Sequence, residues 1–327
     1  MRFIPFSIST YRRLAGAIAL SVLVGCGSSP QPEPVTSAAP SAPATNVAKP
    51  VTPTPGPVIS ADMSLLPRAV TSFGAAAHNG WLYTLGGYSG EPHNYSKEGQ
   101  SGALHRLKLA DGQTWQELPG VDHLQSVALV AHGDSLIRIG GMRALNSSSE
   151  SERLSSVTEV ARFVTGTGTW QDMPALPEGR SSHDAVIAGG VLYTIGGWQL
   201  TPEDGERKWH KTGLRLDLQA EDAQWSEFAV PFERRAFAVA ATDRHLVAIG
   251  GMSSNNKPSK QVDIYNPQTE AWERGPDYPG WPFGVAAVGV GEHIYASGRD
   301  GGVYRLTVGT DAWQRVGALA FARFFHR

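Results

Sequence analysis

The sequence predicts an all-β protein made of five similar units that follow one another along the chain. Three observations support this prediction: a strand-like segment ending in two glycines recurs, the interval between its copies is nearly constant, and a tryptophan follows each copy. The copies are WLYTLGG (81–87), SLIRIGG (135–141), VLYTIGG (191–197), HLVAIGG (245–251) and the degenerate HIYASGR (293–299). The first four glycine pairs begin 54, 56 and 54 residues apart, and a period near 50 residues indicates a repeat architecture.

The first 25 residues have the features of a signal peptide. A basic segment precedes an apolar run of 11 residues at 14–24, which is too short to span a bilayer but typical of an exported protein's leader. The sequence LVGC at 23–26 resembles the lipobox of bacterial lipoproteins, and Cys26 is the only cysteine in the chain. We therefore expect lipidation of Cys26. Because Gly27 follows rather than aspartate, we expect an outer-membrane lipoprotein that faces the periplasm or the cell surface.

Residues 26–57 are predicted to form a disordered tether. They are rich in proline, alanine, serine and threonine, and they cannot bury enough apolar surface to offset their chain entropy. Residues 58–327 remain for one large all-β domain. The formal net charge is −2 and no block of basic residues occurs, so nucleic acid is not an expected partner and the lipid is the only expected membrane anchor.

One complete unit, residues 177–230, predicts four short strands. The first strand precedes VLYTIGG (191–197), which is the second strand and ends in a glycine pair. After a polar loop, LRLDL (214–218) alternates apolar and polar residues, as a half-buried strand does. The fourth strand, AQWSEF (223–228), carries a tryptophan. Four strands in this order are typical of one blade of a β-propeller.

The other units follow the same order. Their third strands are expected at 104–109, 157–163, 262–265 and 303–308, and the fourth-strand tryptophans of the five units are Trp115, Trp170, Trp225, Trp272 and Trp313. A large flat side chain can fill the wedge between neighbouring sheets, and a glycine pair allows positive φ and a close backbone approach. Both features therefore predict structural rather than catalytic roles.

These residues resemble the kelch repeat. The resemblance rests on the glycine pair after the second strand, an aromatic residue in the third strand (clearest at Tyr265) and the tryptophan of the fourth strand, and it covers residues 67–318. It implies a kelch-type β-propeller in which the first strand of each unit lines a central channel. Two units depart from the pattern, because unit five has lost its glycine pair (Ser297, Gly298) and unit two has Ile137 where other units have tyrosine.

The two ends of the repeat region leave the closure of the ring open. DMSLLP (62–67) matches DMPALP (172–177), which predicts an extra fourth strand before the first unit. LAFARFFHR (319–327) matches LPEGRSSHD (176–184), which predicts the start of a further first strand. Either five blades close with overlapping ends, or a ring of six is incomplete. We favour five four-stranded blades, because one outer strand and a stub cannot form a sheet face that buries its neighbours.

Long loops are predicted on one face of the propeller. In an up-and-down sheet, the loops after the second and fourth strands emerge on the same side. The loops after the second strand are long in the first three units, at 88–102, 142–156 and 198–213. Binding residues are concentrated in loops on rigid scaffolds. We call the side that carries these loops the loop face and predict that it binds a partner.

Arginine and aromatic side chains are expected to converge at the loop face. The ligand-binding candidates are Arg68, Tyr88, Arg180, His183, Trp198, Trp209, Arg234, Arg235, Trp281 and Arg299. Arginine provides paired donors for an anion, and aromatic rings provide flat apolar surfaces. The alternative, which we favour for the arginines, is that they bind backbone carbonyls between blades. Trp209 is expected at a loop tip as a contact with a partner.

No catalytic constellation is evident in the sequence. The ten histidines do not show metal-ligand spacing, and the glycine pairs end strands rather than open phosphate-binding helices. Copper radical oxidases of the galactose oxidase type share the kelch fold but need a cysteine crosslinked to tyrosine, and no cysteine lies in the repeat region. We therefore assign no catalytic residue and expect neither a metal nor a cofactor.

The sequence thus predicts an envelope-anchored kelch-repeat protein that recognises a protein or glycan partner through its loop face. The alternative is a carbohydrate isomerase or mutarotase acting on an anionic sugar such as sialic acid, because periplasmic sialic acid mutarotases are kelch propellers. Arg180, Arg234 and Glu233 would then be the first candidates for its site. A passive structural role in the envelope is a third interpretation.

Overall fold

The computed structural model describes residues 58–59, 63–202, 207–320, 322–323 and 325–327. The signal peptide and the tether predicted for residues 1–57 lie outside this part of the chain. The described residues contain 27 β-strands and no helix. Their secondary structure confirms the predicted all-β class.

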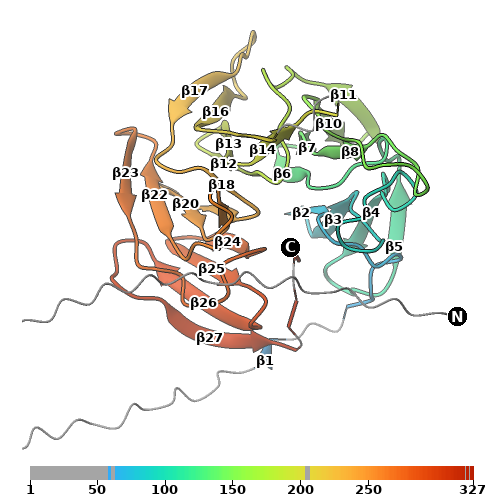
Figure 1. Ribbon diagram of the computed structural model, residues 1–327. Coiled ribbons are helices and arrows are strands. Elements are labelled where there is room, and N and C mark those ends of the chain that lie inside the picture. The colour runs from blue at the N-terminus through green and yellow to red at the C-terminus, as the bar shows by residue number, and fades with distance from the viewer. Residues whose placement is uncertain (1–57, 60–62, 203–206, 321, 324) are drawn as a thin grey trace, which may run out of the picture. The chain divides into compact units, whose positions relative to one another are not determined.

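Five sets of four antiparallel strands repeat the predicted strand order and form the blades of a propeller, with the first strands toward the centre and the fourth strands outside (Figure 1); the sheet of the last blade gains one further strand. Blade 1 contains β2 (Gly74–His78), β3 (Trp81–Leu85), β4 (Leu104–Lys108) and β5 (Trp115–Leu118). Blade 2 contains β6 (Ala128–His132), β7 (Ser135–Ile139), β10 (Val160–Val164) and β11 (Thr169–Asp172). Blade 3 contains β12 (Asp184–Ala188), β13 (Val191–Ile195), β16 (Thr212–Asp217) and β17 (Ser226–Ala229).

The last two blades follow the same antiparallel order. Blade 4 contains β19 (Ala238–Ala241), β20 (Leu246–Ile249), β22 (Val262–Asn266) and β23 (Ala271–Arg274). Blade 5 contains β24 (Ala286–Val290), β25 (His293–Ser297), β26 (Gly302–Thr307) and β27 (Gln314–Leu319). The five blades confirm the fold class and the number of four-stranded units that we favoured.

Tight turns join the first two strands of the blades. Between β12 and β13 the turn is Gly189–Gly190, with φ of 58° and 81°. Between β2 and β3 it is Asn79–Gly80, with φ of 47° and 77°. Positive φ at both turn residues matches the twist of the flanking strands, which explains the preference for glycine and asparagine at these positions.

The glycine pairs after the second strands are points where adjacent blades touch. In blade 2, the N–H of Gly141 donates a 2.8 Å hydrogen bond to the carbonyl of Arg180 in blade 3. A Cβ on Gly140 would come closer than 3.0 Å to the same carbonyl oxygen. The corresponding bonds at the other pairs are Gly87 to Leu124, Gly197 to Arg234 and Gly251 to Pro282. A side chain at the first glycine would therefore push the next blade away.

The fourth-strand tryptophans link each blade to the segment before it. The indole N–H of Trp225 donates a 2.8 Å hydrogen bond to the carbonyl of Pro174 in the preceding repeat. The equivalent bonds are Trp115 to Ser64, Trp170 to Pro119, Trp272 to Ala229 and Trp313 to Pro276, at 2.8–3.1 Å. The tryptophans thus combine apolar packing with a directional bond, as predicted for residues that fill the wedge between sheets.

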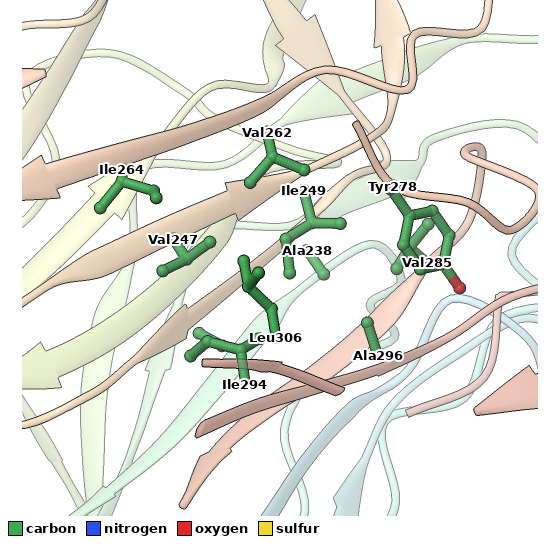
Figure 2. Close-up of a cluster of buried hydrophobic side chains, with 11 residues drawn as sticks. Ala238, Val247, Ile249, Val262, Ile264, Tyr278, Val285, Ile294, Ala296 and Leu306 are labelled. Carbon is green, nitrogen blue, oxygen red and sulfur yellow. The ribbon is translucent and has the colours of Figure 1, made fainter. Parts of the chain in front are cut away.

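Apolar side chains fill the space between neighbouring blades. Figure 2 shows the cluster between blades 4 and 5, where Val247 and Ile249 of β20 pack with Ile294 of β25 and Leu306 of β26. Val247, Ile249, Ile294 and Leu306 are fully buried, and each such side chain stabilises the fold by about 1.5–3 kcal/mol relative to exposure to water. Similar clusters lie between the other consecutive blades.

A series of four backbone hydrogen bonds links consecutive blades near the propeller axis on the loop face. Just before the first strand, each blade has a residue with positive φ: Ser72 (57°), Ser126 (53°), Ser182 (52°), Ala236 (52°) and Gly284 (70°). In blades 2 to 5, the N–H of this residue donates a hydrogen bond of 2.6–3.2 Å to the carbonyl of the equivalent residue in the preceding blade. Phe325, with φ of 51°, has the same backbone conformation. Its position agrees with the sequence match between 319–327 and 176–184.

Residues from both ends of the repeat region join blade 5 to blade 1. β1 (Val58–Ile59) pairs in parallel with β27, and the backbone of Ser64 then bonds to Gly112 and Trp115 of blade 1. The fourth strand predicted at 62–67 is therefore wrong, because residues 63–67 form no strand and the pairing occurs earlier, at β1. On the axial side, His326 bonds to Ser297 and Arg327 bonds to the carbonyl of Phe73.

The close approach at the glycine pairs predicts a large effect of Gly140→Ala. The added methyl group would meet the Arg180 carbonyl, so urea unfolding should show a loss of about 3 kcal/mol. Gly133→Ala is the matched control, because Gly133 also has positive φ but has open space around it, and its loss should be about 1 kcal/mol. Equal losses in the two variants would contradict the proposed contact between blades.

Candidate functional site

The long loops of the first three units contact one another on the loop face. The second loop forms a hairpin of β8 (Met142–Ala144) and β9 (Leu154–Ser156), and the third forms a hairpin of β14 (Trp198–Leu200) and β15 (Arg207–Trp209). The Gln100 amide binds both the carbonyl of Met142 and the N–H of Ala144. Ser156 accepts a hydrogen bond from the N–H of Leu200. The three loops are therefore fixed to one another as one surface.

Two of the candidate arginines bind backbone carbonyls inside their own blades. Arg180 is 2% exposed and donates to the carbonyls of Gly196 and Thr212 at 2.8 and 3.2 Å. Arg234 is 1% exposed and makes the equivalent bonds to Gly250 and Gln261 at 3.0 and 2.6 Å. Burial lowers the pKa of each guanidinium to about 10. Both guanidinium groups thus stabilise the backbone where the second strand of the blade ends.

Arg234 also forms a buried ion pair with Asp263, which lies in β22. Its guanidinium stacks on the ring of Phe232, with 3.8 Å from Cζ to the ring centroid. Removing one partner of a buried ion pair leaves an uncompensated charge, which is strongly destabilising. The geometry of Arg234 is therefore that of a structural side chain.

His183 faces a small cavity on the propeller axis. The cavity has a volume of about 30 Å³, and its lining includes Ser72, Ser126, Ser182 and His326. His183 is 2% exposed, and neither of its ring nitrogens has a hydrogen-bond partner. Burial, together with the positive charge of Arg180, holds its pKa well below the usual value. His183 is therefore a buried, neutral side chain at the edge of the cavity.

A second cavity, of about 400 Å³, follows the central channel. Small apolar residues from all five first strands line it, as the resemblance to kelch repeats implies. Its charged lining groups are Asp184 and Arg327, whose side chains lie 3.5 Å apart. The Asp184 carboxylate also accepts hydrogen bonds from the N–H groups of Ala185 and Val239. Burial raises the pKa of Asp184, and the charge of Arg327 partly opposes this shift.

Arg235 and aromatic side chains form a cluster on the rim of the loop face. Arg235 lies in β18 (Arg234–Arg235), which pairs with β21 (Met252–Ser253). Its guanidinium lies 4.1 Å from the ring centroid of Trp198, 5.8 Å from that of Trp209 and 5.7 Å from that of Phe283. We call Arg235, Trp198, Trp209 and Phe283 the rim cluster. The sequence did not indicate Phe283, because nothing in its local pattern predicts proximity to the third loop.

The third loop differs from its predicted conformation. Trp209 was expected at the tip, but it pairs across the hairpin with Trp198, with the ring centroids 5.6 Å apart. The next residue, His210, is 5% exposed and contacts the carbonyl of Gly179 through its ring. Residues 198–200 and 207–209 pair as strands instead of forming an open loop. Trp209 is thus a half-buried member of the rim cluster.

The remaining candidates lie in two other places. Arg68 binds Ser89 and the carbonyl of Glu98, while the hydroxyl of Tyr88, which is 5% exposed, donates to the carbonyl of Asn94. On blade 5, Trp281 is 43% exposed, and the guanidinium of Arg299 lies 5.9 Å from its ring centroid. The structure therefore brings together Trp198, Trp209 and Arg235 but not the full set of ten.

Among the residues that the structure describes, no group of three or more histidine, cysteine, aspartate or glutamate side chains could hold a metal ion. The same residues contain no helix long and apolar enough to cross a membrane.

Comparison with known sequences identifies kelch proteins. A family model described as the Kelch motif matches residues 233–277. Kelch repeat and BTB domain-containing protein 12 of Danio rerio is 26% identical over 187 residues, which are 54% of this chain and 29% of that protein. Kelch-like protein 36 of Rattus norvegicus is 27% identical over 186 residues, or 54% of this chain and 30% of that protein. The matches thus cover less than a third of either relative.

A solved structure has a similar fold. The structure entitled "Structure of YjhT" aligns with a TM-score of 0.63 and 14% sequence identity, covering 80% of this chain and 88% of that chain. At this identity the similarity concerns the fold alone. It agrees with the arrangement of blades described above.

The buried histidines predict a loss of stability in mild acid. Burial lowers the pKa of His210 from 6.5 to about 4, so the unfolded chain binds more protons in this interval. The free energy of unfolding should therefore be fully retained above pH 6.5 and fall toward pH 4, by about 3 kcal/mol for this group. His326 has the same direction of shift, whereas the raised pKa of Asp184 acts in the opposite sense.

Urea unfolding at several pH values measures this dependence. His210→Gln should flatten the decline between pH 6.5 and 4, and His123→Gln, which alters an exposed histidine, is the control. If the His210→Gln and wild-type proteins lost stability in parallel, buried His210 would not be the cause.

Proposed function

The chain is a kelch-repeat β-propeller, and we propose that it captures a protein partner in the cell envelope through its loop face. Kelch propellers typically bind protein partners, which supports the general role. The rim cluster supports the choice of surface. It places two tryptophans and an arginine, residue types enriched at the energetic centres of interfaces, on loops that a rigid scaffold holds together.

The predicted leader supplies the envelope context of this proposal. Cys26 would carry the lipid that anchors the chain in the outer membrane, and residues 27–57 would separate the propeller from the lipid surface. A partner in the same compartment would then meet the loop face at high effective concentration. A glycan partner would use the same surface and is an outcome of the test below.

Shortening the third loop tests the proposed surface. Replacing residues 200–207 with Asn-Gly would join Gln199 to Lys208, which already face each other across the hairpin, through a two-residue turn. A photoreactive amino acid at Lys211, whose side chain is 77% exposed, would report contact with a partner in intact cells. Combined with Trp198→Ala and Trp209→Ala, which remove the two tryptophans of the rim cluster, this shortening should lower the amount of crosslinked protein at least about tenfold, since hot-spot contacts dominate binding.

A change on the opposite face is the control for this experiment. Asp243→Gly alters the turn between β19 and β20 and should leave crosslinking unchanged. If shortening the loop left crosslinking intact, the proposed surface would be wrong. Crosslinks to polysaccharide instead of protein would show that the partner is a glycan.

A second candidate function is isomerisation of an anionic sugar such as sialic acid. The cavity of the central channel favours it, because its volume of about 400 Å³ fits a sugar and its lining includes Arg327, whose guanidinium would pair with a sugar carboxylate. Arg327→Met should then slow the anomerisation of sialic acid, followed by NMR, without unfolding the protein. If the wild-type chain did not accelerate anomerisation, this function would be rejected.

A further inference from the structure

The described residues contain five first strands, but six residues have the backbone conformation that precedes a first strand. In each of the five blades, the residue with positive φ lies two positions before the strand, as Ser182 does before Asp184. Phe325 is the sixth such residue, so Arg327 lies in the register of Asp184, which is the first residue of β12. The repeat geometry therefore defines a place for one more first strand, which we call the sixth-strand position.

The sixth-strand position lies between β24 of blade 5 and β2 of blade 1. Around the rest of the ring, consecutive first strands pack side by side in the order β2, β6, β12, β19 and β24. β24 and β2 do not pack together in this way, although blades 5 and 1 are neighbours in the ring (Figure 1). Among the residues that the structure describes, none of the buried apolar clusters joins blade 5 to blade 1. The interface between these two blades is therefore less filled than the other four.

The wall of blade 5 that faces the sixth-strand position is accessible to a partner. Val288 and Val290 lie on the same face of β24 and are 57% and 58% exposed. Tyr295 of β25 lies opposite Val288 and is half-buried, whereas its equivalent in blade 4, Val247, is fully buried against blade 5. β24 is also the last strand of its sheet, so its outer edge pairs with no strand among the described residues. Exposed apolar side chains on an open strand edge form a template for pairing with another chain.

The opposite wall, on blade 1, is open in the same way. Leu82 of β3 is half-buried. Its equivalents in the other blades are fully buried against the preceding blade: Leu136, Leu192, Leu246 and Ile294. Of the described residues that line the 400 Å³ channel cavity, Leu82 is the only one from a second strand. The cavity therefore extends outward from the axis at the sixth-strand position.

The other interfaces show which kind of segment fits this position. In blade 3, Ala185 and Ile187 of β12 and Leu192 of β13 pack against blade 2 and help to bury Ile137. The matching occupant is an extended segment with small and aliphatic side chains. The proline-rich tether predicted for residues 26–57 does not match, because proline has no N–H for pairing. A lipid chain would leave the backbone groups at the edge of β24 without partners.

We propose that a protein partner inserts a β-strand at the sixth-strand position, with aliphatic side chains against Val288, Tyr295 and Leu82. The backbone of the inserted strand pairs with the open edge of β24, and its side chains remove the exposed valines from water. This docking site is separate from the rim cluster, so it goes beyond the proposed capture of a partner through the loop face.

The test is an NMR titration of the full-length chain with ¹³C-labelled valine methyl groups. The probe is the peptide acetyl-Lys-Ala-Val-Ile-Ala-Gly-Gly-Val-Leu-Tyr-Thr-Lys-amide, which copies residues 185–194 and hence the inner hairpin of blade 3. It should shift the signals of Val288 and Val290 saturably, with these signals assigned from Val288→Ala and Val290→Ala. An analogue with aspartate in place of isoleucine and leucine should bind at least about tenfold more weakly, because two aliphatic contacts are lost.

Two substitutions separate the sixth-strand position from other exposed apolar residues. Val288→Asp should weaken binding of the peptide at least about tenfold, followed at the Val290 signals, because it places a charge against the inserted strand. Val288 is exposed, so urea unfolding of this variant should match that of the wild type. Leu109→Asp is the matched control, because Leu109 is 46% exposed in a turn of blade 1 and does not line the channel cavity. The control should bind the peptide as the wild type does.

Equal binding of the two peptides, or no shift at Val288 and Val290, would overturn the proposal. Valine signals that change with protein concentration alone, together with a dimer in analytical ultracentrifugation, would also overturn it, since a second copy would then occupy the position. Failure of the titration leaves the crosslinking test unaffected, because that test probes the loop face through Lys211. Conversely, a loss of crosslinking at Lys211 would not change the binding of the peptide at β24.

Discussion

The contact between a glycine pair and the carbonyl of the following repeat governs how the blades are placed. At each intact pair, the second glycine donates to that carbonyl while the first leaves room for it, as Gly140 and Gly141 do for Arg180. Wedge packing is non-directional and would tolerate sliding of one sheet over another. A short directional bond at a point of closest approach fixes the angle and height of each blade, and therefore fixes where its loops emerge.

The backbone at this contact also explains why the neighbouring residues Arg234 and Arg235 have different environments. The carbonyl of Arg234 receives the bond from Gly197, while its side chain turns into blade 4 and binds the carbonyl of Gly250. Arg235 follows it in a strand, so its side chain points to the opposite side, toward the third loop. The backbone geometry that joins the blades thus places one arginine in the structure and presents the next to the rim.

Much of this arrangement could be predicted from the sequence, because it follows from residues that recur in register. The glycine pairs and fourth-strand tryptophans indicated the blades and their order, and the positions of the long loops indicated one elaborated face. The rim cluster could not be predicted in full, since Phe283 meets Trp198 only through the tertiary fold. The positive φ of Ser72, Ser126 and Ser182 was also missed, because serine gives no local signal for that conformation.

Amide hydrogen exchange at the second glycines tests the central claim most directly. If the contacts between blades fix the propeller, the amides of Gly87, Gly141, Gly197 and Gly251 should exchange together and as slowly as amides in the central strands, through global unfolding. Fast exchange at these four amides, at rates typical of the surrounding loops, would show that the blades are held by wedge packing alone and would contradict the account.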